Sequence, residues 1–366
     1  MSRPLRLVVL GLSLSSSWGN GHATTYRALL RAMARRGHDI LFLERDQRWY
    51  AAHRDLRAPE FCELVLYRDL RELEPYRAAV ARADATIVGS FVPDGIAVGR
   101  WVQRVAEGVT AFYDIDTPVT LASLAQGDCT YLAPAQIPDY DLYLSFTGGP
   151  TLQALAQRYG APAARALYCS VDDETYRPVA ALPRYDLGYL GTYSADRQES
   201  LDRLLLEPAR RMPNRRFLIG GAQYPDSRRW PSNVTHLEHV PPAAHAEFYG
   251  SCRFTLNVTR AEMIRAGFSP SVRLFEAGAC ASPVISDRWD GIGSFFTPDR
   301  EILLADSTEQ VLDALATWSE PRRQALAAAA RRRTLRQHTA AHRAAELEAY
   351  LLAAIGGTTR QLAAVV

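Results

Sequence analysis

The segment 269–283 contains residue types that can bind an anion and a sugar. It begins with a serine and a proline that suit the N-cap and first positions of a helix, so we expect a helix over residues 270–280. Arg273 and Glu276 share one face near its start. There the guanidinium and the Ser271 amide can hold a phosphate, and the carboxylate can accept hydrogen bonds from sugar hydroxyls. The alternative is a surface ion pair on an ordinary helix.

A histidine and two aspartates follow predicted strands in the N-terminal half. His22 comes after strand 5–10, whereas Asp114 and Asp116 come after strand 110–113. Ligands of α/β folds bind at the carboxyl ends of parallel strands. His22 can there take the proton of an acceptor hydroxyl, with either aspartate orienting it or acting as the base itself. The alternatives are that His22 and Asp116 cap the helices that follow them.

Length and composition predict a globular protein of two domains. The chain has 366 residues, a length that exceeds what one hydrophobic core usually supports. Of these residues 48% are hydrophobic and 22% are charged, which is typical of a globular protein. The net charge of +2 gives no electrostatic reason to expect nucleic acid or an anionic membrane as partner. All 42 basic side chains are arginine, which excludes Schiff-base and Walker-A lysine chemistry.

The cysteines and apolar runs predict a cytoplasmic protein. The five cysteines are far apart and lack the spacing of a metal site, so we expect reduced thiols and no metal ligands. The apolar opening is short and leads into a polar loop, which favours a buried strand over a signal peptide. No run approaches the ~18 apolar residues of a membrane helix. Oligomeric state is left open.

Alternating strands and helices predict an α/β fold with parallel sheets. A polar, proline-containing stretch near residues 172–184 is the expected linker, which gives an N-terminal domain over 1–178 and a second over 185–333. The expected strands are 5–10, 39–43, 63–66, 85–88, 110–113 and 142–145, then 186–190, 216–219, 234–237, 253–257 and 284–286. The expected helices are 24–36, 69–82, 94–107 and 151–159, then 197–211, 243–249, 270–280, 308–318 and 320–333.

A last helix is expected over 334–355, within a C-terminal segment 334–366. Its apolar face follows a complete second domain, so we expect it to pack back on the N-terminal domain. The chain should fray at Gly356. In the first loop, Gly19-Asn-Gly21 lacks the third glycine of a dinucleotide-binding motif, so a dehydrogenase is disfavoured although Glu44 closes the second strand.

The order of several motifs resembles GT-B glycosyltransferases, most closely the CgeB or spore maturation protein group. These motifs are, in chain order, Ser17-Trp-Gly-Asn-Gly-His22, Asp116-Thr-Pro118, Tyr189-Leu-Gly-Thr192, Gly220-Gly221, His239-Val-Pro-Pro242, Asn257-Val-Thr-Arg260, Ser269 through Asp287, and His338 with His342. The likeness spans nearly the whole chain. It implies two Rossmann-like domains that face each other across a cleft.

The resemblance also implies an activity and a binding site. The protein would move a sugar, as a hexosyl or related transferase, from a UDP- or dTDP-type nucleotide sugar to a small-molecule or glycan hydroxyl or amine. Glu276 would bind the ribose and Arg273 the diphosphate, and the latter would also assist catalysis. Gly191, Thr192, Arg260 and Ser271 would complete the donor site. Because no Asp-x-Asp motif lies in a suitable loop, neither a metal nor a cofactor is expected.

One position departs from the pattern of this group. Retaining GT-B enzymes often carry two glutamates eight residues apart, but the residue eight before Glu276 is Phe268. Inversion or retention at the sugar is therefore left open. Two other functions fit the same sequence: a sugar-nucleotide epimerase on this fold, and a non-catalytic protein that binds a nucleotide sugar.

Overall fold

The protein forms two compact units. The structure is a computed structural model that describes residues 3–19, 21–180, 182–227 and 229–365. Unit 1 comprises Met1–Ser17, His22–Cys169 and Ala340–Val366, and unit 2 comprises Trp18–Gly21 and Ser170–Thr339. The division falls after Cys169 rather than within 178–185, and the returning segment starts at Ala340 rather than at residue 334.

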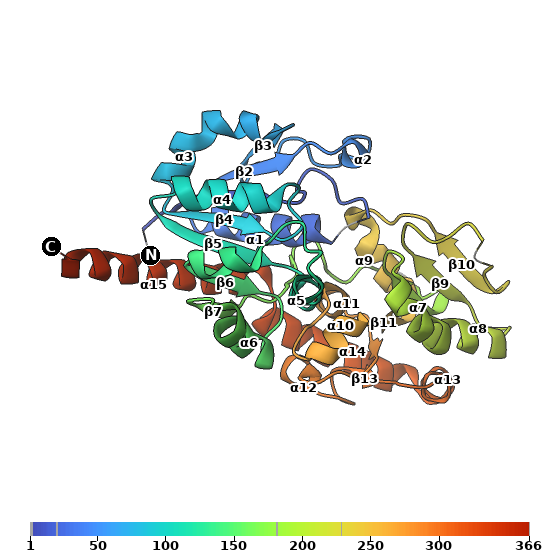
Figure 1. The fold of residues 1–366 in the computed structure, drawn as a ribbon. Coiled ribbons are helices and arrows are strands. Elements are labelled where there is room, and N and C mark those ends of the chain that lie inside the picture. The colour runs from blue at the N-terminus through green and yellow to red at the C-terminus, as the bar shows by residue number, and fades with distance from the viewer. Residues whose placement is uncertain (1–2, 20, 181, 228, 366) are drawn as a thin grey trace. The chain divides into compact units, whose positions relative to one another are not determined.

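Unit 1 is built on a sheet in which every strand pairing is parallel (Figure 1). The strand order is β3-β2-β1-β4-β5-β6-β7. Its strands are β1 (Arg6–Gly11), β2 (Asp39–Arg45), β3 (Glu63–Tyr67), β4 (Ala85–Gly89), β5 (Val109–Asp114), β6 (Leu142–Ser145) and β7 (Ala164–Ala166). The central strands are buried on both faces, which explains their nearly continuous apolar sequences.

Helices connect these strands, as the alternating pattern predicted. The helical elements of unit 1 are α1 (His22–Arg35), α2 (Arg48–Ala51), η1 (Leu70–Tyr76), α3 (Arg77–Arg82), α4 (Gly95–Val105), α5 (Thr117–Gln126), η2 (Pro134–Asp139), α6 (Pro150–Tyr159) and α15 (Ala340–Val365). The expected helix 69–82 is a 3-10 turn followed by α3, because Pro75 lies inside its first half. The short elements α2, η2 and β7 were not predicted, and α5 was expected only as the helix that Asp116 caps in the alternative interpretation.

Unit 2 has a second parallel sheet, with strand order β10-β9-β8-β11-β12-β13. Its strands are β8 (Tyr185–Leu190), β9 (Phe217–Gly220), β10 (Val234–Leu237), β11 (Cys252–Asn257), β12 (Val284–Ser286) and β13 (Leu303–Leu304). Its helices are α7 (Ala195–Leu201), η3 (Asp202–Leu206), α8 (Glu207–Arg211), α9 (Pro242–Gly250), α10 (Ala261–Ala266), α11 (Val272–Ala279), α12 (Ile292–Phe295), α13 (Thr308–Thr317) and α14 (Glu320–Gln337).

Several helix boundaries differ from the expectation. Ser271, not Ser269, is the N-cap of α11, because its extended backbone (φ −79°, ψ 142°) keeps the preceding proline out of the helix. The break in the C-terminal helices falls at His338–Thr339 instead of residue 334. The expected fraying at Gly356 is also wrong, since α15 continues to Val365.

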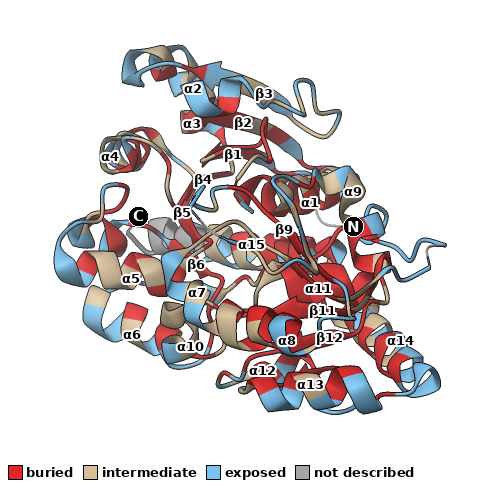
Figure 2. Ribbon diagram, turned by 90° about the vertical axis from the view of Figure 1, so that its right-hand side faces the viewer, coloured by how far each residue is buried: buried red, intermediate tan, exposed pale blue. Residues whose placement is uncertain are grey.

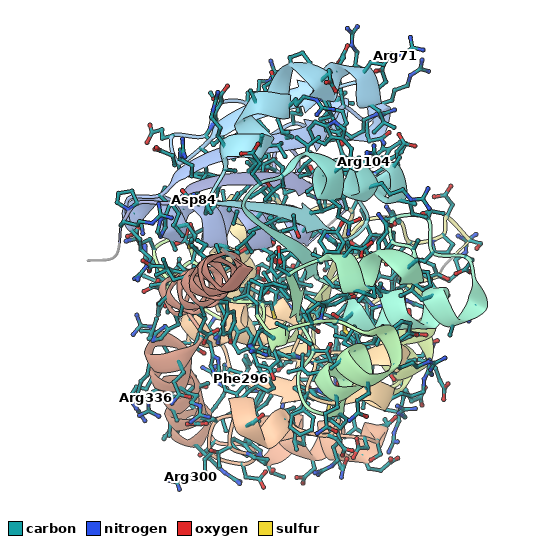
Figure 3. All side chains as sticks on the ribbon, turned by 60° about the vertical axis from the view of Figure 1, so that its left-hand side comes forward. Arg71, Asp84, Arg104, Phe296, Arg300 and Arg336 are labelled. Carbon is teal, nitrogen blue, oxygen red and sulfur yellow. The ribbon has the colours of Figure 1, made fainter. Side chains whose placement is uncertain are left out.

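The buried residues lie along the two sheets and on the helix faces that cover them (Figure 2). Helix α11 is an extreme case, because every residue from Arg273 to Ala279 is buried. Many arginines lie at the surface instead. Figure 3 labels Arg71, Arg104, Arg300 and Arg336, which are all exposed, whereas the labelled Phe296 is 2% exposed. Among the described residues, no helix has the length and apolar character needed to cross a membrane.

Helix α15 packs against α1 and β5 within unit 1. The carboxylate of Glu348 is buried there and accepts a hydrogen bond from Arg36 Nε (2.6 Å). His38 Nε2 lies 3.8 Å from Glu348 Oε1, and His38 Nδ1 accepts a hydrogen bond from the Leu5 amide (3.1 Å). Because Nδ1 accepts, this buried imidazole is neutral and carries its proton on Nε2. A polar cluster therefore joins the last helix to the first strand and helix.

Protonation of His38 should destabilise the protein in mild acid. Burial lowers the pKa of this imidazole, although Glu348 opposes the shift. The unfolded chain therefore binds a proton more readily, and stability falls as the pH drops below about 6.5. His38→Asn keeps an acceptor for the Leu5 amide and should lose less stability between pH 7.5 and pH 5. Urea unfolding at both values measures this, with the exposed His53→Asn as control. Equal pH dependence in parent and His38→Asn would contradict the assignment.

Candidate active site

A buried glutamate holds the loop that follows β1. Glu44, at the end of β2, is 1% exposed and accepts hydrogen bonds from the amides of Leu14 (2.7 Å) and Ser15 (2.8 Å). The Ser15 hydroxyl donates to the same carboxylate (2.6 Å). Glu44 thus anchors its own protein loop and is not a free carboxylate for a ribose, as a dinucleotide-binding domain would require. Asn20, in the glycine-containing part of this loop, lies outside the described residues.

His22 is the first residue of α1 and is 7% exposed. Its Nε2 lies 3.6 Å from Asp116 Oδ2, across the ends of β1 and β5. Its Nδ1 is buried and has no hydrogen-bond partner among the residues that the structure describes. The side chain is therefore paired with a carboxylate and does not cap the helix. The structure brings together His22 and Asp116, both of which were predicted as catalytic residues.

The two aspartates after β5 have different surroundings. Asp116 occupies the N-cap position of α5, but its side chain makes no capping hydrogen bond. Asp114 is fully buried and accepts hydrogen bonds from Tyr143 (2.5 Å) and Thr120 (2.8 Å). Burial raises the pKa of Asp114 to about 6, although these hydrogen bonds oppose the shift. Asp116 is thus the carboxylate that faces His22, whereas Asp114 holds the surrounding side chains in place.

Two aromatic residues beside His22 were not predicted. Phe91 follows β4, and its ring lies at 89° to the His22 imidazole with the centroids 5.5 Å apart. The Tyr131 ring packs against Phe91 at 4.5 Å, and its hydroxyl is 2.8 Å from Thr120 Oγ1. Phe91 has a φ of 61°, a left-handed backbone that is rare for a bulky side chain. No pattern in the sequence indicates this conformation.

Two glycines meet at the carboxyl ends of β8 and β9 in unit 2. Leu190 pairs with Gly220 in the sheet, and the Gly191 amide donates to the Gly220 carbonyl (2.8 Å). A Cβ on Gly221 would lie 2.0 Å from the Gly191 carbonyl oxygen, so this approach requires glycine. Thr192 follows, and its carbonyl accepts a hydrogen bond from Arg197 (2.6 Å). Gly191 and Thr192 are partly exposed, and Gly191 packs closely against Gly221.

Arg273 lies beneath this glycine-containing edge. It is 6% exposed, and its guanidinium donates to the Leu190 carbonyl (2.5 Å) and to Asn257 Oδ1 (2.7 Å). Its charge lies 4.8 Å from the centroid of the Tyr189 ring. Nη2 would come within 2.8 Å of a Cβ on Gly191. Arg273 therefore places a buried positive charge directly below Gly191.

Glu276, one turn later, is 4% exposed and accepts a hydrogen bond from the Tyr249 hydroxyl (2.8 Å). His245 Nδ1 lies 3.9 Å from the same carboxylate and 3.0 Å from the Tyr176 hydroxyl. Burial and Glu276 raise the pKa of both tyrosines. Arg273 and Glu276 are both buried and bond to different partners. The alternative interpretation, a surface ion pair between them, is therefore wrong. Sequence reasoning missed the tyrosines and histidine, which come from α9 and the segment before β8.

The loop after β11 is held by a second buried carboxylate. Asp287 accepts hydrogen bonds from the amide and the hydroxyl of Thr259, both at 2.7 Å. Arg260 follows and lies 3.5 Å from Asp196, which also accepts from the Ala261 amide (3.2 Å). Burial would raise the pKa of Asp196, but Ser194 and Arg260 hold it below its ordinary value. The predicted Arg260 thus lies beside the start of α7.

Ser271 precedes Arg273 and places its Oγ 3.5 Å from Nη1 of that arginine. Phe268, where a retaining enzyme often has glutamate, has a φ of 47°, and its ring occupies the space beside Gly291. In the described part of the chain, no group of three or more His, Cys, Asp or Glu side chains is arranged to hold a metal ion. The predicted donor-site residues Gly191, Ser271 and Arg273 lie close together, with Glu276 on the same helix as Arg273.

Comparison with known families gives a partial match. A family model described as glycosyl transferase-like matches residues 197–349. This region covers most of unit 2, including α11 and its buried arginine and glutamate. No curated protein matches the chain in sequence.

Solved structures match over almost the whole chain. Sucrose-phosphate synthase from Thermosynechococcus elongatus has a TM-score of 0.68 at 15% identity, covering 99% of this chain and 100% of that one. HepE from Anabaena, in complex with UDP-glucose, has a TM-score of 0.68 at 13% identity, with 95% and 100% covered. An α-glucosyltransferase in complex with UDP has a TM-score of 0.72 at 11% identity, with 95% and 100% covered. The chain therefore has the fold of GT-B glycosyltransferases, as the sequence predicted.

Ionisation of Asp114 should weaken the protein as the pH rises. Because its pKa is about 6 in the folded protein, against 3.8 ordinarily, the folded state binds the proton more tightly. Stability therefore falls between about pH 4 and pH 6, by roughly 3 kcal/mol for a shift of this size. The free energy of unfolding of Asp114→Asn, measured with urea, should rise relative to that of the parent between pH 4.5 and pH 7.5. The exposed Asp139→Asn is the control. If the free energies of unfolding of Asp114→Asn and the parent differ by the same amount at both pH values, this account is wrong.

Proposed function

We propose that the protein is a glycosyltransferase that moves a sugar from a nucleotide-diphosphate sugar to an acceptor hydroxyl. The observation that carries this proposal is the pairing of His22 with Asp116 at the strand ends of unit 1, on a fold whose structural relatives include complexes with UDP and UDP-glucose. Unit 1 supplies the base and unit 2 binds the donor. The motif order further supports a CgeB-like group and a UDP- or dTDP-type donor as part of this proposal.

The base is the imidazole of His22. It takes the proton of the acceptor hydroxyl while the oxygen attacks the anomeric carbon and the bond to the diphosphate breaks. Asp116, 3.6 Å from Nε2, stabilises the imidazolium that forms. Deprotonating the nucleophile suits direct displacement, so we propose inversion at the sugar. The presence of Phe268 eight residues before Glu276 supports this, because no carboxylate stands at that position.

The leaving diphosphate is stabilised by the edge that Arg273 supports. The buried guanidinium and the Thr192 amide attract the negative charge that grows on the leaving group. We propose that this stabilisation operates without a metal ion, because the guanidinium of Arg273 supplies the positive charge. Glu276, held by Tyr249, accepts hydrogen bonds from the ribose hydroxyls. Activity that survives EDTA would support metal independence.

Donor binding should depend on Glu276 and Arg273 in different ways. Glu276→Ala removes a ribose contact and should weaken UDP binding about 10- to 100-fold, from the usual 1.5–3 kcal/mol of a charged hydrogen bond. Arg273→Ala should lower turnover by more than it weakens binding, because its charge acts most strongly on the leaving group. Calorimetric titration with UDP and thermal melts of each variant measure this. The proposed site is wrong if both folded variants bind UDP as tightly as the parent.

Removing the base should stop transfer and leave donor binding intact. His22→Ala should lower the rate of UDP release from UDP-glucose, with acceptors present, by about 10² to 10⁴. Its affinity for UDP should not change. His53→Ala, an exposed histidine of the same unit, is the matched control. Turnover within about threefold of the parent across pH 6 to 9 would eliminate His22 as the base. Interconversion of the sugar without an acceptor would instead indicate an epimerase.

A further inference from the structure

The loop after β4 holds an aromatic side chain in a strained conformation beside the proposed base. Phe91 has a φ of 61° and lies between Ser90 and Val92, which are 0% and 1% exposed. Ser90 fixes the loop, because its amide donates to the Tyr113 carbonyl (2.9 Å) and its hydroxyl accepts from the Ile115 amide (3.1 Å). A left-handed backbone is energetically unfavourable at a bulky residue. The surrounding contacts therefore impose this conformation on Phe91.

The Phe91 ring packs on another aromatic ring, and the residue remains partly exposed. Tyr131 packs on it at 4.5 Å and is itself fixed through its hydroxyl, which is 2.8 Å from Thr120 Oγ1. Thr120 donates in turn to the buried carboxylate of Asp114 (2.8 Å). His22 lies at a right angle to Phe91. The result is a rigid aromatic surface directly beside the imidazole, with its position set by a chain of hydrogen bonds.

We infer that Phe91 is the platform on which the acceptor lies, and that the acceptor is an uncharged molecule whose reactive hydroxyl is carried on a ring. An aromatic face attracts C–H groups and ring faces, and it offers no hydrogen bond to a flexible polyol. The hydroxyl at the ring edge then meets His22. Asp116 beside the imidazole disfavours an anionic acceptor. This assignment of the acceptor class rests on the proposed function.

Sugars and phenols both have the required chemistry, and binding experiments can distinguish them. Saturation-transfer NMR on the full chain would use methyl β-D-glucopyranoside and 4-methylumbelliferone as ring probes and glycerol as the ringless control. We expect at least one ring probe, and not glycerol, to receive saturation from the parent. Phe91→Gly takes the left-handed backbone without strain and should reduce that signal at least fivefold. Phe91→Tyr keeps the ring and should retain it. Whichever ring probe gives the stronger Phe91-dependent signal identifies the source.

The control is Asp299→Gly, which relieves the same backbone conformation at an exposed site and should bind the probes like the parent. Thermal melts confirm folding, and Phe91→Asn replaces the glycine variant if that one is unfolded. The inference is overturned if neither ring probe binds the parent, if glycerol binds equally, or if a folded Phe91→Gly binds the ring probes unchanged. A separate titration with UDP measures binding at the proposed donor site independently of ring binding at Phe91. Ring binding that depends on Phe91 without UDP binding would support the platform and reject the transferase.

Discussion

Buried carboxylates at the carboxyl ends of strands hold the loops of both units in place. Glu44 binds two amides of the loop after β1, and Asp287 binds the amide and hydroxyl of Thr259 in the loop after β11. Asp114 plays the same part for Thr120 and Tyr143. A loop fixed by a carboxylate in a low-dielectric environment loses little entropy when a ligand binds. Each unit thus presents preorganised groups where parallel strands end.

The two units use charge in opposite ways. Unit 1 places a carboxylate and an aromatic ring beside an imidazole, which suits proton removal from an uncharged group. Unit 2 buries the guanidinium of Arg273 below Gly191, which suits an anion. Such a division matches a reaction in which one partner loses a proton and the other leaves as a diphosphate. The arginine is expensive to bury, and its hydrogen bonds to Leu190 and Asn257 offset that cost.

The fold was predictable because its signals are local. Strands 142–145, 234–237 and 284–286 were predicted with the bounds that the structure has, since each is a short stretch that begins with an apolar β-forming residue and lies between turn residues. His22 and Asp116 could be found because both follow central strands of one parallel sheet. Phe91 could not, because the positive φ that places its ring beside His22 is imposed by tertiary contacts. The network around Glu276 was hidden likewise, since Tyr176, His245 and Tyr249 are distant in sequence and become neighbours only after folding.

The membership of α15 in unit 1 affects the order in which the chain can fold during synthesis. Apart from Trp18–Gly21, unit 2 is one continuous segment, Ser170–Thr339, and all of it leaves the ribosome before Ala340 does. Nascent domains usually fold from the N-terminus onwards. Here the N-terminal sheet waits for its last helix, with the α1 surface that α15 covers still exposed to solvent. The unit made first is therefore completed last, and the surface of α1 stays uncovered until the residues from Ala340 onwards have been made.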